Sequence, residues 1–518
     1  MATAKSKKPL TTRDNLSALI ASARKILRKD KGLNGDVDRL PLLTWVMFLK
    51  FLDDLEFKHE QEAALDGKRY QPIIEKPYRW RDWATREDGI TGDELLDFVG
   101  QEHAHRADGS FGQGLFAYLR ALAGEGEKGS QREVIANVFK GVQNRMVSGY
   151  LLRDIVNKIN GIHFNASEEI HTLSHLYESM LREMRDAAGD SGEFYTPRPV
   201  VRFMVQVTDP QLGDTVLDPA CGTGGFLACT LEHLRGQIKT VDDHQIWQQA
   251  IHGVEKKQLP HLLCVTNMLL HGIEIPHQIK HDNTLARPLR DYRPKERVDV
   301  ILTNPPFGGT EEPGIEANFP ADLRTKETAD LFLVLIMHLL KDGGRAAVVL
   351  PDGTLFGEGV KTRIKERLLS ECNLHTIVRL PNGVFAPYTG IKTNLLFFTK
   401  GTPTREVWYY EHPYPAGYKS HSKTKPIRIE EFAAEKAWWG SADDNFASRA
   451  ENEFAWKVSL DEIRARNYNL DIKNPHHPEQ DSHDPAELKA HYDALQSQIQ
   501  ATRDELKAIL AAALGGGR

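Results

Sequence analysis

The spacing of apolar residues changes along the chain at about residue 190. Before that point, apolar residues recur three or four positions apart, which is the spacing of one face of an amphipathic helix. This spacing is clearest over residues 12–60 and 131–160, and it is weaker over residues 65–130. The pattern predicts a mostly helical domain over residues 1–165. No motif in this region carries chemistry, so packing or contact with a partner is its expected role.

After residue 190, short apolar runs rich in β-branched residues alternate with helical stretches. The runs cover residues 215–218, 253–255, 278–282, 298–303, 345–350, 376–380 and 394–399. Strands that alternate with helices are typical of βαβ units, which assemble into a mainly parallel sheet. We therefore expect an α/β domain over residues 166–401, built on a mainly parallel sheet of seven strands.

The C-terminal part of the chain shows two further patterns. Residues 402–480 contain Pro, Lys and several Trp without clear periodicity, and we expect an irregular extension there. Apolar positions then alternate four and three residues apart, as in a heptad seam. They are Leu488, Tyr492, Leu495, Ile499, Thr502, Leu506 and Ile509. A helix of about three heptads is marginal alone. Residues 481–518 are therefore predicted to form a coiled-coil helix that packs on a partner subunit or on the chain's own N-terminal helices.

Composition restricts the class of protein. The chain has 518 residues, of which 40% are hydrophobic and 27% are charged, as in ordinary soluble proteins, and its net charge is −6. Proteins that bind a long stretch of DNA without a partner usually carry more positive charge. A nucleic-acid role therefore requires a local basic patch or a partner that supplies the contact. The first 40 residues, with ten Lys or Arg against four Asp, are either such a patch or a solvated helical face.

Cysteine usage and apolar stretches favour a cytoplasmic protein. The four cysteines form no C-x-x-C pair, so we expect neither a zinc site nor a disulfide framework, and no bound metal. The N-terminus has no apolar stretch after its charged residues, so no secretory signal is visible. The longest apolar stretch, Leu331–Leu340, is about half the length of a membrane span.

A glycine-rich turn follows the first predicted strand. The string Asp218-Pro-Ala-Cys-Gly-Thr-Gly-Gly-Phe226 lacks the G-x-G-x-x-G order of dinucleotide sites, but its glycines allow a tight turn and close approach of the backbone to a ligand. It suits a nucleotide-like cofactor in a Rossmann-like fold. The candidate cofactor residues are Asp218, Ala220, Gly222, Thr223, Gly224, Gly225 and Phe226. Asp218 could accept a bond from a cofactor ammonium group, or it could cap the following helix.

Acidic residues end the next two predicted strands. Glu255 is placed to accept both ribose hydroxyls of a nucleotide, although it could be an ordinary surface glutamate. Asp282, followed by Asn283, could accept from an adenine amino group, or the two could form a turn. A stiff loop before the sheet could close over the other end of the cofactor, or simply begin a helix. Its candidate residues are Glu193, Phe194, Tyr195, Thr196, Pro197 and Arg198.

The fourth predicted strand ends in Asn304-Pro305-Pro306-Phe307. An exocyclic amine of a base is a poor nucleophile, and two acceptors that face its hydrogens can hold the nitrogen as it becomes positive. Asn304 offers a side-chain carbonyl and Pro305 a backbone carbonyl, while Pro306 stiffens the turn. Phe307 offers a flat face on which an extruded base can stack. The two turns together predict methyl transfer from S-adenosylmethionine to the amino group of a base.

These motifs closely resemble the modification (M) subunits of type I restriction-modification systems, within the amino-group DNA methyltransferases. The resemblance covers about residues 165–475. It includes four further segments, which are Glu193–Arg198, Leu380–Phe385, Thr389–Asn394 and Arg466–Leu470. It implies a seven-stranded methyltransferase sheet and N6-adenine methylation of DNA. It also implies S-adenosylmethionine as cofactor, with contacts at Glu193–Arg198, Thr223–Gly225 and Glu255.

The resemblance further implies partners. A separate specificity subunit would read the DNA sequence, clamped by the N-terminal domains and terminal helices of two M subunits, and a restriction subunit could join them. The N-terminus departs from the commonest pattern of the family, so a related phage-defence complex stays open. So do cytosine-N4 methylation of DNA, methylation of RNA or of a protein glutamine amide, and a scaffold that binds the cofactor without turnover.

Overall fold

The computed structural model describes two stretches of the chain. The first is residues 13–476, apart from 88, 126–129, 163–173, 175–176, 182–195, 308, 387–388 and 443; the second is 496, 499–500, 502–504 and 506–507. The chain divides into two compact units, Met1–Ile472 and Lys473–Arg518. In the second unit, residues 496, 499–500, 502–504 and 506–507 are helical, and the rest of the predicted coiled-coil helix lies outside the described residues.

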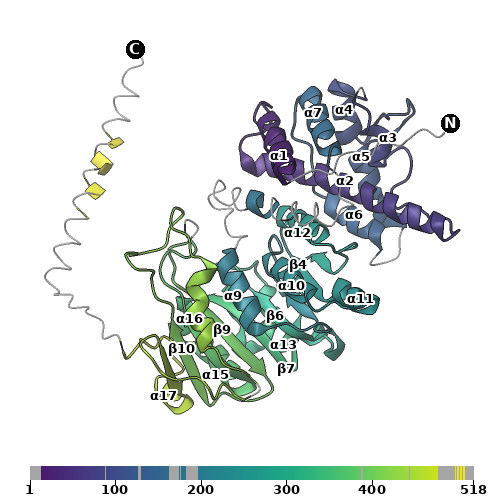
Figure 1. Ribbon diagram of the computed structural model, residues 1–518. Helices are drawn as coiled ribbons and strands as arrows, with labels where there is room; N and C mark the ends of the chain where they lie inside the picture. The colour runs from purple at the N-terminus through teal and green to yellow at the C-terminus, as the bar shows by residue number, and fades with distance from the viewer. Residues whose placement is uncertain are drawn as a thin grey trace. The chain divides into compact units, whose positions relative to one another are not determined.

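The N-terminal region of the first unit is helical, as predicted (Figure 1). Its helices are α1 Arg13–Leu27, α2 Asp36–Leu65, α3 Trp80–Trp83, α4 Gly92–Gly100, α5 Leu115–Ala121, α6 Gln131–Phe139 and α7 Gly149–Asn160, with a hairpin of β1 His103–His105 and β2 Phe111–Gln113. The long helix α2 organises this region because its aromatic residues Trp45 and Phe48 are fully buried. Trp45 packs edge-on against Phe116 of α5, with ring centroids 5.1 Å apart, and Phe48 packs against Phe139 of α6.

A mixed, mainly parallel sheet forms the centre of the remaining chain, which confirms the predicted α/β class. Its strands are β3 Val216–Asp218, β4 Ile251–Glu255, β5 Ile279–His281, β6 Val298–Thr303, β7 Leu340–Pro351, β8 Cys372–Arg379, β9 Thr393–Lys400, β10 Glu406–Glu411 and β11 Ala455–Ser459. Their order is β11-β10-β8-β9-β7-β6-β3-β4-β5. The antiparallel neighbours are β7–β9, β8–β9 and β10–β11.

The predicted count of seven strands was too low for this sheet, which has nine among the described residues. The two additional strands, β10 and β11, come from the segment that was expected to be irregular. β10 pairs in parallel with β8, and its four central residues, 407–410, are all buried. A strand that is buried on both faces shows no alternation of apolar and polar residues, so periodicity does not reveal it.

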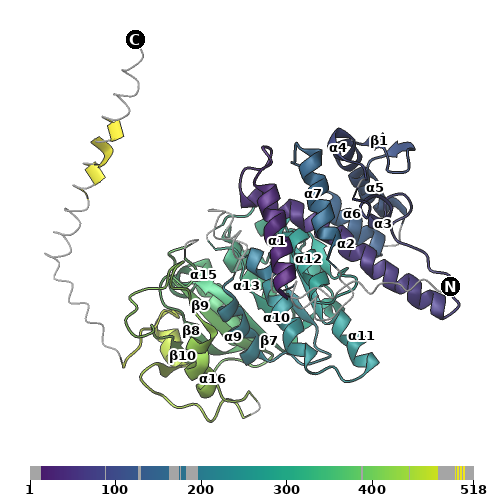
Figure 2. The same ribbon diagram turned by 45° about the horizontal axis from the view of Figure 1, so that its top comes forward.

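Helices cover the two faces of the sheet. On one face lie α9 Arg198–Thr208, α10 Gly225–Arg235 and α12 Gln258–Leu270; on the other lie α13 Thr328–Leu339 and α15 Val360–Glu371. A helix α11, Val241–Gln249, follows α10. The N-terminal helices pack on α12, because Leu263 and Leu269 share one apolar core with Phe48 of α2. Figure 2 shows α12 beside the N-terminal helices in a second view.

The strand order places two turns at one crevice. From β3 the chain proceeds to β4 and β5 on one side and then returns to β6 on the other side of β3. At such a switch point the loops that follow the two central strands diverge, and open α/β sheets bind their ligands there. The turns after β3 and β6 are the two that carry the sequence motifs.

Candidate active site

A cavity of about 310 Å³ lies at the carboxyl ends of β3, β4 and β6. Twelve of the sequence-predicted site residues line it: Thr196, Asp218, Ala220, Gly222, Thr223, Gly225, Phe226, Glu255, Asp282, Asn283, Asn304 and Pro306. The cavity therefore joins the glycine-rich turn and the Asn-Pro-Pro-Phe turn in one space. The volume and the lining are those of a pocket for a small organic ligand.

The glycine-rich turn depends on left-handed backbone. Gly222 has φ of 53° and Gly224 has φ of 79°, conformations that favour glycine. A Cβ atom at Gly224 would lie 2.8 Å from Sγ of Cys264 and 2.9 Å from Cε of Met268, both on α12. Gly224 thus serves close packing of the turn against α12 and does not line the cavity, whereas Gly222 does.

Glu255 ends β4 with its carboxylate held against the glycine-rich turn. The backbone N–H of Gly222 donates to Oε2 over 2.9 Å, and the N–H of Lys257 donates to Oε1 over 2.7 Å. The side chain is 8% exposed, and burial raises its pKa. A carboxylate has about four acceptor positions. Two backbone donors therefore leave room for hydrogen bonds from a ligand in the cavity.

Asp218 is buried at the end of β3, with 1% of its surface exposed. Its Oδ1 accepts from the Thr303 hydroxyl over 2.7 Å and from the N–H of Ala220 over 3.1 Å. Burial raises the pKa of Asp218 to about 7, against the lowering effect of these two donors. The alternative role of capping the next helix does not hold, because Gly224 occupies the N-cap of α10.

Asn304 has an amide orientation fixed by one neighbour. Its Nδ2 donates to Oγ1 of Thr196 over 3.0 Å. Its Oδ1 is buried and has no hydrogen-bond partner among the described residues. A buried acceptor without a donor costs about 1–3 kcal/mol. Asn304 lines the cavity, so a ligand that donated a hydrogen bond to this oxygen would be stabilised there.

The other residues of the Asn-Pro-Pro-Phe turn take different positions. Pro305 is buried and does not line the cavity, whereas Pro306 is exposed and does. Phe307 is half-buried and does not line the cavity; it packs edge-on against Phe385, with ring centroids 5.9 Å apart and an angle of 69° between the rings. Phe385 belongs to the segment singled out in the sequence as a later motif.

The loop before the sheet is described from Thr196 onward, and one of its described candidate residues lines the cavity. Thr196 lines it, but Pro197 is the N-cap of α9 and Arg198 points elsewhere. The guanidinium of Arg198 forms an ion pair with Glu178 and donates to the backbone oxygen of Gly225. Arg198 thus anchors the start of α10 to its neighbours. Glu193, Phe194 and Tyr195 lie outside the described residues.

Asp282 and Asn283 stand at the rim of the cavity. Asp282 is exposed, and its Oδ1 accepts from the N–H of Asn283 over 2.8 Å. The amide of Asn283 donates to Glu311 over 3.3 Å, and Lys256 donates to the same oxygen of Glu311 over 3.1 Å. These contacts connect the ends of β4 and β5 to the segment after the Asn-Pro-Pro-Phe turn.

Several lining residues were not found from the sequence. They are Pro219, Cys221, Val254, Lys256, Lys257, Thr284, Gly309, Thr310, Glu311, Thr328 and Phe332. Lys256 directly follows Glu255, so its place in the chain was a usable signal. Glu311 and Phe332 carry no local signal, because they reach the cavity only through the fold of the chain after β6.

Two kinds of feature are absent from the described part of the chain. No three His, Cys, Asp or Glu residues among the described ones are arranged to hold a metal ion. No described helix combines the length and apolarity needed to cross a membrane.

Two protein-family models match the chain. Residues 168–484, more than half of the chain, match the N-6 DNA Methylase family. Residues 16–159 match the HsdM N-terminal domain.

Individual relatives agree with these matches. The EcoEI type I restriction enzyme methylase subunit from Escherichia coli is 56% identical over 97% of this chain and 99% of that subunit. The EcoKI methylase subunit from E. coli strain K12 is 30% identical over 73% of this chain and 72% of its own length.

Two solved structures show the same fold over nearly the whole chain. A modification subunit assigned to a type I restriction enzyme of Vibrio vulnificus YJ016 has a TM-score of 0.79 and 59% identity, covering 91% of this chain and 99% of that one. A structure that addresses complex assembly and conformational transition of the type I restriction-modification system has a TM-score of 0.80 and 39% identity, covering 97% and 99%. The chain therefore belongs to the N-6 DNA methylase family, as a methylase subunit of a type I restriction-modification system that methylates adenine at N6 in DNA.

Proposed function

We propose that the chain binds S-adenosylmethionine in the 310 Å³ cavity and transfers its methyl group to N6 of an adenine that has swung out of the DNA helix. One observation carries the proposal. Asn304, whose buried Oδ1 has no hydrogen-bond partner among the described residues, and Glu255 both line this cavity. A residue with an acceptor for an amine and a residue with an acceptor for a ribose therefore border one space.

The residues of the cavity fit the cofactor. Glu255 has acceptor positions left for two ribose hydroxyls after its bonds to Gly222 and Lys257. Asp218 accepts only through Oδ1 from described residues, which leaves Oδ2 to accept from an ammonium group. Asp282 is exposed at the rim and can accept from an adenine amino group. When bound, S-adenosylmethionine supplies an electrophilic methyl group.

The turn after β6 would hold the target amine. Oδ1 of Asn304 and the backbone oxygen of Pro305 accept from the two hydrogens of the N6 group. These acceptors stabilise the positive charge that grows on the nitrogen as its new bond to carbon forms. Thr196 accepts from Nδ2 of Asn304 and thereby keeps Oδ1 directed at the amine. Phe307, supported by Phe385, offers its face to the extruded base.

The chain would act within a larger complex. We propose that a specificity subunit reads the DNA sequence, that two copies of this chain flank it, and that a restriction subunit can join. The net charge of −6 supports this arrangement, because a subunit that binds DNA together with a partner does not need an overall positive charge. The heptad seam near the C-terminus supports contact with another subunit.

The decisive experiment is substitution of Asn304. In a complex with the specificity subunit, Asn304→Ala should lower kcat for methyl transfer to duplex DNA by at least about 100-fold, because it removes an acceptor for developing charge. Affinity for S-adenosylmethionine should change little. A control is Asn373→Ala, on β8, which does not line the cavity. An unchanged rate in the Asn304 variant, or N4-methylcytosine as the product nucleoside, would refute the proposal.

A further inference from the structure

A loop rich in basic residues follows β10. This basic loop, residues 412–428, contains no acidic residue, although the chain as a whole carries a net charge of −6. Its cationic side chains are Lys419, Lys423, Lys425 and Arg428, and all four residues are exposed. Two tyrosines, Tyr414 and Tyr418, are interspersed with them. Basic side chains interleaved with aromatic rings are typical of segments that bind nucleic acid.

The base of the basic loop is fixed by buried side chains. Nδ1 of His412 lies in hydrogen-bonding contact with Glu435, and both side chains are fully buried. Nε2 of His421 lies 3.5 Å from a carboxylate oxygen of Glu431. These two carboxylates therefore face inward to the histidines of the loop, away from its exposed lysines.

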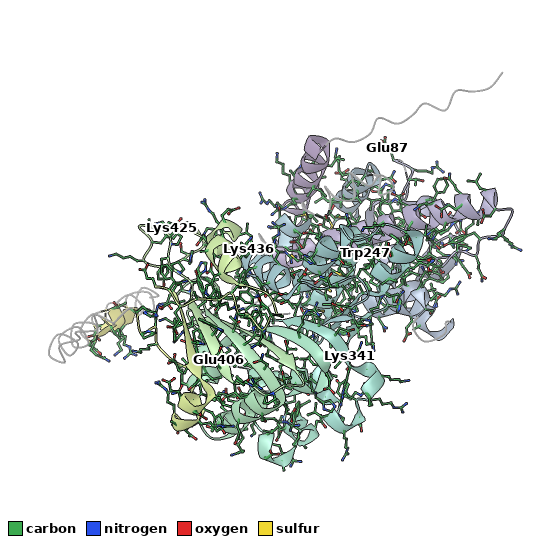
Figure 3. All side chains as sticks on the ribbon, turned by 60° about the horizontal axis from the view of Figure 1, so that its bottom comes forward. Glu87, Trp247, Lys341, Glu406, Lys425 and Lys436 are labelled. Carbon is green, nitrogen blue, oxygen red and sulfur yellow. The ribbon has the colours of Figure 1, made fainter. Side chains whose placement is uncertain are left out.

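The tip of the basic loop has a defined shape. The backbones of Ser422 and Lys425 exchange two hydrogen bonds of 3.1 Å each, which close a tight turn around Lys423 and Thr424. The Lys425 ammonium lies 4.9 Å from the ring centroid of Tyr418. Figure 3 shows Lys425 at the periphery of the molecule, beyond the strands of the sheet. Among the described residues, no carboxylate lies within 4.0 Å of the charged groups of Lys419, Lys425 or Arg428.

The basic loop also contacts the segment that supports the active site. The N–H of Asn382 donates to the Tyr414 hydroxyl over 2.8 Å, and the N–H of His421 donates to the backbone oxygen of Asn382 over 3.1 Å. Gly383 has φ of 82°, and a Cβ atom there would lie 2.1 Å from the backbone oxygen of His421. Three residues after Asn382, Phe385 packs against Phe307. Contacts therefore run from the basic loop to the catalytic turn.

We propose that the basic loop binds the phosphodiester backbone of DNA beside the base that enters the active site. Its contacts at Asn382 and Gly383 set the distance between that backbone and Phe307. Contacts to phosphates position a protein on DNA without reading its sequence. Such a role suits a subunit whose target site is chosen elsewhere. The inference rests on the proposed function, because it assigns a DNA contact to the same active site.

The test replaces three lysines of the basic loop in the full chain, assembled with its specificity subunit. The variant is Lys419→Gln/Lys423→Gln/Lys425→Gln, and the measurement is Kd for a duplex that contains the target site, between about 50 and 200 mM salt. We expect Kd at the lower salt to rise by about tenfold or more. The slope of log Kd against log salt should fall by about 0.9 for each phosphate that the variant no longer neutralises. Binding of S-adenosylmethionine should be unchanged.

A matched control removes the same charge from exposed positions elsewhere. It is Lys239→Gln/Lys295→Gln/Lys457→Gln, and it should leave the salt slope at the value of the unmodified chain. Equal slopes in the two triple variants would overturn the inference. So would loss of subunit assembly in the loop variant with unaltered DNA affinity of the assembled fraction, because the loop would then be a protein-docking surface.

A second variant tests the positioning role separately. Gly383→Ala keeps every charge but forces the basic loop away from Asn382, so it should slow methyl transfer while the salt slope stays unchanged. Thermal unfolding shows whether the variant remains folded; an unchanged rate in a folded variant contradicts the positioning role.

The outcomes are distinct from those of the proposed function. If Asn304→Ala abolishes methyl transfer while the loop variant binds DNA normally, only the present inference fails.

Discussion

The hydroxyl of Thr303 donates a hydrogen bond of 2.7 Å to the carboxylate of Asp218, and both side chains are buried. Thr303 is the last residue of β6 and precedes Asn304, whereas Asp218 ends β3 and opens the glycine-rich turn. This single bond therefore ties together the two turns that wall the cavity. A substitution in one turn should therefore alter the geometry of the other turn.

The first prediction concerns Asp218 and pH. Because burial raises its pKa from 3.8 to about 7, the folded chain binds this proton more tightly than the unfolded chain does. The stabilisation is complete below about pH 4 and is lost as the pH rises through about 7. Asp218→Asn cannot ionise. Between about pH 5 and pH 8, the unfolding free energy of the unmodified chain should therefore fall by roughly 3 kcal/mol more than that of the variant. Urea unfolding without cofactor checks this, and equal falls would contradict it.

The second prediction concerns Thr196, a positioning residue. Thr196→Val removes the acceptor for Nδ2 of Asn304, so the amide can rotate and Oδ1 is no longer held in place. One hydrogen bond contributes about 0.5–1.5 kcal/mol. We expect kcat to fall by about 3- to 10-fold, with KM for DNA nearly constant, in steady-state methyl transfer. Thr196→Ser keeps the hydroxyl and should restore the rate; a slow serine variant would show that the methyl group matters instead.

The third prediction concerns Glu255 and cofactor affinity. Glu255→Gln turns one acceptor oxygen into an NH₂ group, which must face the N–H of either Gly222 or Lys257. Loss of hydrogen bonds to a charged group costs about 1.5–3 kcal/mol. The Kd for S-adenosylmethionine should rise by about 10- to 100-fold in calorimetry. Glu312→Gln, at a surface position that pairs with Lys256, is the control and should bind normally. Equal affinities of the two variants would remove Glu255 from the cofactor site.

The fourth prediction concerns stability of the glycine-rich turn. Gly224→Ala places a Cβ atom 2.8 Å from Sγ of Cys264 on a backbone with φ of 79°. Overpacking and backbone strain should each cost about 1–3 kcal/mol, so the thermal midpoint should fall by several degrees. Gly236→Ala, at the other end of α10, meets no atom within 4 Å and has φ of −66°, so it should be neutral. A neutral Gly224 variant would show that α12 can move to accommodate the methyl group.

Sequence patterns predicted the elements of the sheet wherever a strand carried a local signal. Strands β3 and β6 were predicted because each is an apolar run that ends in a distinctive polar turn. Strand β10 was missed because it is buried on both faces and has no alternation. Strand β11 was missed as well, and it has only five residues. Arg198 was assigned to the cofactor as part of the loop Glu193–Arg198, but in the fold it pairs with Glu178. Adjacency in the chain does not fix the direction of a side chain.

The sequence by itself determined which chemical groups this protein carries and on which strand ends they lie, since both turns are short strings with local geometry. The tertiary structure decided which groups meet. The bond between Thr196 and Asn304 joins residues 108 positions apart, and the bond between Asp218 and Thr303 joins residues 85 apart. Both depend on β6 returning to lie beside β3. That return is set by packing of the whole sheet between its two layers of helices, and no local pattern encodes it.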